Sequence, residues 1–172
     1  MASFDLAISK TLSFEGCDKY TETTGDTGGA TKYGISQKSY PNLNIKSLTE
    51  AEAKAIYKRD YWDRVRGDDI TSQAMAESIF DFAVNSGVKT ASTLAQKAAY
   101  KASGYNPESR QLIDGIIGPT TALALNSVDN ITFLAVFSLF KIYHYADICN
   151  KKRDQSKFLL GWVNRTLHEW MP

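Results

Sequence analysis

The sequence has few cysteines, few prolines and almost no net charge, and these features exclude several classes of protein. It holds two cysteines and four prolines among 172 residues, and a chain of this length can bury a core without disulfide or metal staples. Its 20 basic and 19 acidic side chains leave a formal net charge of +1. No strong field would therefore steer the chain onto nucleic acid or an anionic membrane, so we expect neither as a partner.

A secretory signal and long apolar runs are also missing. The opening MASFDLAISK lacks the basic region, apolar core and cleavage site of a signal peptide, so we expect synthesis in the cytoplasm. In that reducing compartment, Cys17 and Cys149 are expected as free thiols rather than as a disulfide. The most apolar stretch, residues 131–140, is too short for a bilayer, which requires about 20 residues, and predicts a buried core helix.

What the chain does contain is helical periodicity, beginning at its front. Phe4, Ile8 and Leu12 recur at four-residue spacing and predict an amphipathic helix over residues 2–15. Residues 16–46 are rich in Gly, Thr, Lys and Tyr without a helical period, and predict a loop or a small hairpin turning through TGDTGG. The fold class expected is therefore mainly α, with one loop-and-hairpin insertion after the first helix.

Apolar stripes and end signals predict the remaining helices. Both Ser47/Glu50 and Thr49/Glu52 fit a capping box at the start of the second helix. Pro119 occupies the first position of a later helix, where a missing N–H costs nothing. The expected helices lie at residues 47–62, 72–87, 90–103, 119–127, 129–150 and 156–170.

Glu15 is the first candidate for chemistry, because it follows Leu12 on the apolar stripe. Loss of water disfavours a charged carboxylate, so its pKa should rise. A carboxyl group that is still protonated near neutral pH is what a glycosidase needs to donate a proton to a departing sugar oxygen. The alternative is a glutamate at a helix end whose carboxylate lies in water.

The following loop could supply the partners of such an acid. Asp26 could hold or deprotonate a water, and the hydroxyl of Thr31 could share in binding it. Gly28 and Gly29 allow positive φ and close approach of the backbone to a ligand. The alternative is an ordinary tight turn, which Asp and Gly favour wherever they cluster.

The order of these residues resembles a known family. Glu15-Gly16, Asp26, Gly28-Gly29, Thr31 and Tyr33-Gly34-Ile35-Ser36 resemble the opening signature of family 108 glycoside hydrolases, which are phage- and prophage-type N-acetylmuramidases that cleave peptidoglycan. Four further motifs follow in the family's order. They are YKRDYWDRV at 57–65, FDFAVNSG at 80–87, DGIIGPTT at 114–121 and GWVNR at 161–165.

The resemblance implies a lysozyme-like fold in which Glu15 is the general acid and Asp26, helped by Thr31, positions the attacking water. Asp18 and Glu22 are alternative carboxylates for that water. It also implies a catalytic lobe at residues 1–91 and a peptidoglycan-binding helical region at 92–172. No cofactor is required. Such a chain would act as a monomer on glycan strands of the cell wall, and a holin-type pore could release it.

Several other side chains are candidate substrate contacts. Tyr33 lies in a glycine turn near the expected site, and Tyr61 could stack on a sugar or belong to ordinary core packing. Asp81 and Asn85, one helical turn apart, need either structural partners or a sugar's hydroxyl and acetamido groups. His144 and His168 lack neighbours at metal-ligand spacing, so we expect no metal site.

The sequence leaves three functions open. The first is hydrolysis of the β-1,4 bond between N-acetylmuramic acid and N-acetylglucosamine, with Glu15 as acid. The second is a lytic transglycosylase, which needs the acid but no residue to hold a water and which leaves an anhydro end. The third is a non-catalytic module that binds peptidoglycan.

Overall fold

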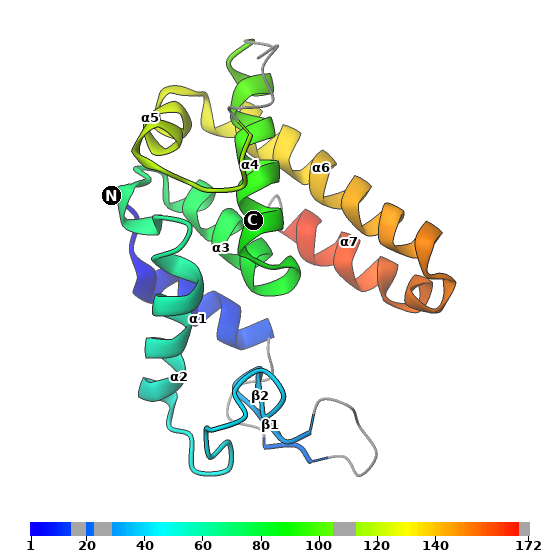
Figure 1. Ribbon diagram of the computed structural model, residues 1–172. Coiled ribbons are helices and arrows are strands. Elements are labelled where there is room, and N and C mark those ends of the chain that lie inside the picture. Colours follow the sequence, from blue (N-terminus) through cyan, green and yellow to red (C-terminus); the bar gives the residue numbers. More distant parts are fainter. Residues whose placement is uncertain (15–19, 23–28, 105–112, 169–172) are drawn as a thin grey trace.

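The computed structural model describes residues 1–14, 20–22, 29–104 and 113–168. These residues form a mainly α fold, consistent with the expected lysozyme-like class, with a small hairpin between the first two helices (Figure 1). The α-helices are α1 (Phe4–Phe14), α2 (Glu50–Tyr57), α3 (Gln73–Ser86), α4 (Val88–Ala102), α5 (Pro119–Ser127), α6 (Asn130–Lys151) and α7 (Leu159–Leu167). The strands are β1 (Thr31–Lys32) and β2 (Ile35–Ser36).

The apolar stripe of α1 faces the core as its spacing predicts. Ile8 and Leu12 are buried, and the ring of Phe4 packs edge-to-face on Trp62 and Phe80. Leu6, which lies off the stripe, is exposed. The helix therefore carries the chain along the core to the position of Glu15, which lies outside the described residues.

The insertion after α1 contains an antiparallel hairpin whose turn is Tyr33–Gly34. Both turn residues have positive φ, 53° and 75°, as two-residue turns between twisted strands require. Thr31 also pairs with Thr21, through backbone hydrogen bonds of 2.8 and 2.9 Å. The predicted turn through TGDTGG thus falls between two paired threonines, with residues 23–28 outside the described part of the chain.

The start of α2 shows which of the two possible capping boxes forms. The Thr49 side chain accepts from the backbone N–H of Glu52, and the Glu52 carboxylate accepts from the backbone N–H of Thr49. Ser47 instead donates to the carbonyl oxygen of Asn44. After α2 the chain widens into a π-helical turn, Lys58–Trp62, and then a 3-10 turn, Gly67–Asp69.

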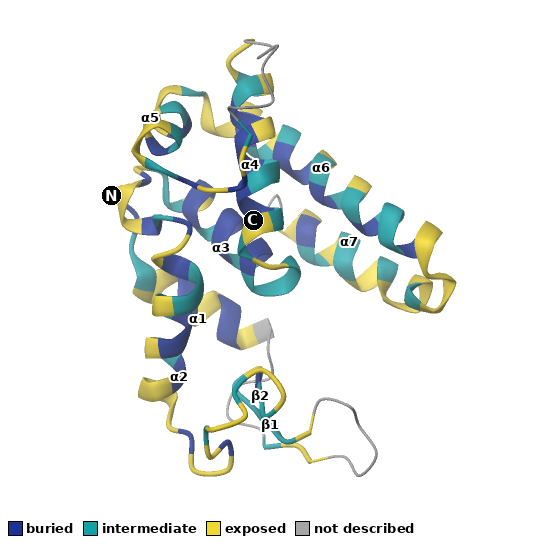
Figure 2. Ribbon diagram, in the orientation of Figure 1, coloured by how far each residue is buried: buried dark blue, intermediate teal, exposed yellow. Residues whose placement is uncertain are grey.

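Helix α3 is the central element of the core (Figure 2). It begins after its N-cap residue Ser72 and packs against α1, α4 and α6. Its predicted stripe of Met75, Ile79, Phe82 and Ala83 is buried. An element enclosed in this way places its polar side chains at fixed positions between its neighbours, and these side chains form much of the candidate site.

A buried glutamine organises the turn before α5. The side-chain oxygen of Gln96 accepts from the backbone N–H of Gly115. Its side-chain nitrogen donates to the carboxylate of Asp114 and to the backbone carbonyl oxygen of Ile116. Pro119 occupies the first turn of α5, as predicted. The DGIIGPTT motif therefore owes its shape to a side chain on α4.

Helix α6 starts after its N-cap Asp129, as predicted, but it differs from the expected fully buried core helix. It is long and apolar enough, by length and composition, to cross a membrane, and 28% of its most apolar window is buried. The expectation counted only residues 131–140, whereas the apolar character continues further along the helix. Core helices of soluble proteins meet the same criterion, and one side of α6 packs on α3, α4 and α7. Cys149 near its end is a buried free thiol.

Candidate active site

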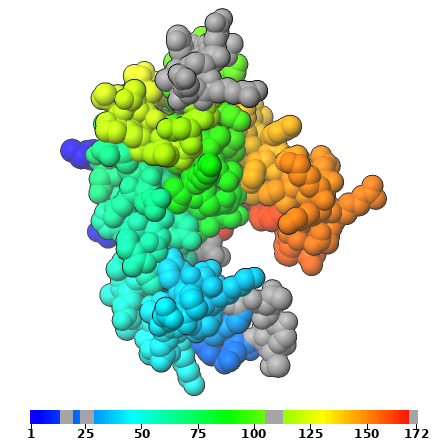
Figure 3. All heavy atoms as spheres, in the orientation of Figure 1, coloured from blue at the N-terminus to red at the C-terminus, as the bar shows by residue number. Residues whose placement is uncertain are grey.

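The surface is hollowed between the hairpin region and the arm formed by α6 and α7 (Figure 3). Two pockets lie near this part of the molecule, and α3 contributes to both. We call them the hairpin pocket and the interhelical pocket. The hairpin pocket, of about 80 Å³, is lined by Gly34, Ile35, Ser36, Ser39, Tyr40, Tyr57, Tyr61 and Val84.

Tyrosines give the hairpin pocket its shape. The Tyr57 hydroxyl donates to the carbonyl oxygen of Tyr33 at 2.9 Å, which fastens the hairpin turn to the end of α2. The rings of Tyr57 and Tyr61 lie 5.8 Å apart. Tyr57 and Trp62 are buried in the core, whereas Tyr61 is half-buried and lines the pocket. Of the two tyrosines of the YKRDYWDRV motif that line this pocket, Tyr61 is therefore the more exposed.

Two charged residues, Arg59 and Asp60, lie beside these tyrosines. The Tyr40 hydroxyl donates to Asp60 at 2.7 Å, and Arg59 donates to both oxygens of the same carboxylate. Burial, together with this hydrogen bond, raises the pKa of Tyr40, so its phenol stays protonated. The Arg59 guanidinium lowers the pKa of Asp60. Arg59 thus has a partner in the chain itself.

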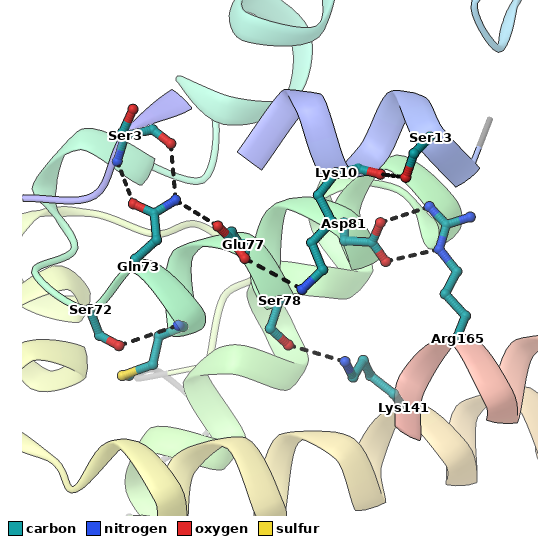
Figure 4. A network of polar contacts seen from close by, with 11 residues as sticks. Ser3, Lys10, Ser13, Ser72, Gln73, Glu77, Ser78, Asp81, Lys141 and Arg165 are labelled. Atoms are coloured by element: carbon teal, nitrogen blue, oxygen red, sulfur yellow. Dashed lines mark hydrogen bonds and ion pairs between the residues drawn. The ribbon is translucent and has the colours of Figure 1, made fainter. Parts of the chain in front are cut away.

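One face of α3 carries a polar stripe at four-residue spacing, formed by Gln73, Glu77, Asp81 and Asn85. Figure 4 shows the first three of them. Gln73 binds the backbone of Ser3 through both ends of its amide and also donates to Glu77. The Glu77 carboxylate lies 3.5 Å from the ammonium of Lys10 on α1. The contacts with Ser3 and Lys10 hold the N-terminal segment and α1 against α3.

The last two residues of the stripe differ in their partners. Arg165 of α7 donates to both carboxylate oxygens of Asp81, at 2.7 and 3.0 Å. Asn85 is half-buried, and its side-chain amide has no hydrogen bond within the part of the chain that the structure describes. A half-buried amide without an internal partner is suited to a ligand with both donors and acceptors, such as a sugar acetamido group.

The interhelical pocket, of about 50 Å³, lies between α1, α3, α6 and α7. Its polar lining is mostly ionic, with Lys10, Glu77, Asp81, Arg165 and His168 around it. Close by, the buried ammonium of Lys141 on α6 donates to the hydroxyl of Ser78 at 3.1 Å. Sequence reasoning missed Lys10 and Lys141. The signal for Lys141 was its position as the first charged residue after the apolar run at residues 131–140.

The structure describes some of the residues that were predicted to be catalytic or substrate-binding and leaves others out. Glu15, Asp26 and Gly28 lie outside the described residues. Thr31 is half-buried on β1, and its hydroxyl has no hydrogen bond in the described part of the chain. Gly29 precedes it with φ of 68° and is exposed. Gly29, Thr31 and Tyr33 therefore lie in and just before the hairpin, while Asp81 and Asn85 belong to α3.

Metal chemistry finds no support in the described ranges. No group of three or more His, Cys, Asp or Glu side chains there could hold an ion. His144 packs on the rings of Phe82 and Tyr145, and His168 lines the interhelical pocket.

Comparison with known proteins agrees with the resemblance seen in the sequence. Residues 8–87 match the model of the family described as glycosyl hydrolase 108, and residues 90–167 match that of a predicted peptidoglycan domain. Among twelve matching chains of solved structures is Brucella abortus SagA, with 23% identity, a TM-score of 0.69, and coverage of 98% of this chain and 96% of that one. This likeness establishes a shared fold. No curated protein matches the chain. Residues 8–87 are therefore similar to the glycosyl hydrolase 108 family, and residues 90–167, which follow them, to a predicted peptidoglycan domain.

Proposed function

We propose that the chain is an N-acetylmuramidase that hydrolyses the β-1,4 bond between N-acetylmuramic acid and N-acetylglucosamine. At the coarser level, the chain is a glycoside hydrolase that acts on peptidoglycan. The observation that carries the proposal is the succession of the two family matches in one chain, a glycosyl hydrolase model followed directly by a peptidoglycan model. The peptidoglycan strand is the substrate that both regions have in common.

In this proposal Glu15 is the general acid. In the sequence it directly follows α1, whose stripe is anchored in the core by Ile8 and Leu12. Glu15 donates its proton to the glycosidic oxygen as the bond from that oxygen to the anomeric carbon breaks. A water then adds to the anomeric carbon and gives its proton to Asp26.

Thr31 is proposed to hold that water together with Asp26. Its backbone is fixed by pairing with Thr21 on one side and Ser36 on the other. Its hydroxyl, which has no hydrogen bond in the described part of the chain, can both donate to and accept from a water. Asp18 and Glu22 remain the alternative carboxylates, and Glu22 is exposed and accepts from the Tyr20 hydroxyl.

The substrate would lie between the hairpin and α3. We assign contacts to Gly28 and Gly29, to Tyr33 and Tyr61, and to Asn85. Tyr61 offers a ring face at the hairpin pocket, and aromatic faces stack on the apolar side of sugar rings. Asn85 offers an amide that has no hydrogen bond to another described residue. Residues 1–91 would form the catalytic lobe, and residues 92–172 the region that grips the glycan.

The test is mass spectrometry of fragments released from purified peptidoglycan by the native chain and by Glu15→Gln. Loss of a general acid lowers the rate by about 100-fold or more, so reducing muramic ends should form with the native chain and nearly vanish with the variant. Glu50→Gln, at an exposed carboxylate on α2, is the matched control and should keep full activity. Asp26→Asn and Glu22→Gln, compared side by side, identify the carboxylate that holds the water.

Two results would contradict the proposal. Anhydro ends from the native chain would make it a lytic transglycosylase and leave Asp26 without a catalytic task. Retention of glycan binding with no fragments from the native chain would make it a binding module.

A further inference from the structure

Two motifs that are far apart in the sequence meet in the fold. Asp81 belongs to FDFAVNSG on α3, and Arg165 closes GWVNR on α7, 84 residues later. The guanidinium donates to the carboxylate through Nε at 3.0 Å and through Nη2 at 2.7 Å. The two side chains are only 21% and 18% exposed. The contact is therefore a two-pronged, largely shielded ion pair, unlike the exposed pairs elsewhere on the molecule.

This ion pair also joins the two family regions. Asp81 lies within the glycosyl hydrolase match at residues 8–87, and Arg165 within the peptidoglycan match at residues 90–167. Both side chains line the interhelical pocket together with Lys10 and Thr11 of α1, and Figure 4 shows Lys10 beside them. Thr11 is buried and precedes Glu15 by four residues in the sequence. Helix α7 is thus fastened to the same face of α3 that holds α1.

The chemistry of the contact fits a positioning role better than a sugar-binding role. Both oxygens of Asp81 already accept from a planar guanidinium, whose fork fixes the direction of approach as well as the distance. A sugar hydroxyl would have to compete with this charge-assisted arrangement. We infer that the Asp81–Arg165 pair is the joint that positions α7 of the peptidoglycan domain on the catalytic region, so that a polymeric strand gripped by one is aligned with the other.

This inference rests on the proposed function, and it identifies Asp81 and Arg165 as positioning residues instead of substrate contacts. Its consequence is a difference between substrates. An insoluble peptidoglycan strand engages both regions, whereas a soluble glycan fragment of about six sugars engages chiefly the catalytic region. Breaking the joint should weaken use of the polymer and spare turnover of the fragment.

The experiment measures KM and kcat for both substrates with Asp81→Asn, Arg165→Gln and the double variant. Each change should raise KM for insoluble peptidoglycan about tenfold, the size expected when one charge-assisted contact is lost, and should leave kcat on the fragment within about twofold. In the double variant, Asp81→Asn should add little to the effect of Arg165→Gln, because the contact between the two side chains is already lost. Arg165→Lys should be intermediate, since lysine cannot form the fork.

The matched control is Asp147→Asn, which removes the exposed Asp147–Lys151 pair on α6 and should change neither KM nor kcat. A second readout, independent of activity, is amide hydrogen exchange of α7, which should become faster in Asp81→Asn and Arg165→Gln and not in Asp147→Asn.

The possible results separate the inference from the proposed function. Unchanged KM and unchanged exchange in α7 would overturn the joint. A fall in kcat on the short fragment as large as the loss of activity on the polymer would also overturn the joint. Such a fall would make Asp81 a substrate contact. If the native chain cuts neither substrate, the proposed function fails, and the exchange of α7 still decides whether the joint exists.

Discussion

At the scale of single residues, close packing around Trp62 accounts for the glycine at position 67. Its ring is fully buried, its indole N–H donates to Asp68 at 2.8 Å, and Phe4 and Phe80 contact it edge-on. Gly67 lies against this ring so closely that a Cβ atom there would fall 2.3 Å from Cε2 of Trp62. The absence of a side chain at position 67 is therefore what lets the ring occupy its place.

Gly67→Ala should accordingly lower the free energy of unfolding by about 1–3 kcal/mol, the usual cost of overpacking a core. Urea unfolding followed by tryptophan fluorescence measures it. Gly161→Ala is the matched control, because nothing lies within 4 Å of that position on α7, and alanine there should stabilise by about 0.5–1 kcal/mol. Equal effects of the two substitutions would show that the contact with Trp62 does not limit position 67.

At the scale of elements, helix ends could be predicted closely because their signals are local. Pro119 and the N-cap Asp129 mark the starts of α5 and α6 as expected. The π-helical turn at Lys58–Trp62 was not predicted, since it depends on how Trp62 packs against distant rings. The TGDTGG turn was predicted, but the pairing of Thr21 with Thr31 required the fold.

The capping of α2 shows what a local pattern can leave undecided. Ser47/Glu50 and Thr49/Glu52 fit the same motif, and the structure uses Thr49. Thr49→Ala should therefore destabilise the protein by about 1 kcal/mol, whereas Ser47→Ala should change stability by a few tenths at most. Thermal unfolding of both variants measures the difference. A larger loss for Ser47→Ala would place the cap two residues earlier.

At the scale of the whole molecule, the class of fold and the order of motifs could be predicted, and the partners of the site residues could not. Spacing placed Asp81 and Asn85 on one face of α3, but nothing local indicated that Arg165 would bind the first of them. The same holds for Lys141 and Ser78, which meet across 63 residues. Such contacts arise from how α6 and α7 pack on α3, and a single sequence does not reveal that packing.

Charges distributed over the whole fold also determine how stability depends on pH. Hydrogen bonds lower the pKa of several carboxyl groups: Glu52, Asp60, Asp68, Asp114 and Asp129. Protons therefore bind the unfolded chain more tightly at these groups. Their stabilising effect is complete above their unfolded pKa values, near 4, and is lost as the pH falls through the lower folded values.

His144 adds an earlier step on the acid side. Burial against Phe82 and Tyr145 lowers its pKa from 6.5, an effect that Asp147 opposes and Lys151 reinforces. The folded chain then holds a neutral imidazole that the unfolded chain protonates first, so stability falls as the pH drops below about 6.5. At the basic end, the raised pKa of Tyr40 keeps its phenol protonated at pH values where the unfolded chain would lose this proton. Stability therefore begins to decline only above about pH 10.

The midpoint temperature of unfolding should therefore be nearly constant between about pH 6.5 and pH 10, and fall in two steps in acid. Scanning calorimetry from pH 3 to pH 10 measures the profile. His144→Phe keeps an aromatic ring against Phe82 and removes the titrating group, so it should abolish the first acid step and leave the second. A first step that persists in the variant would assign it to another group. Loss of both steps would mean that the carboxylates are not what destabilises the fold in stronger acid.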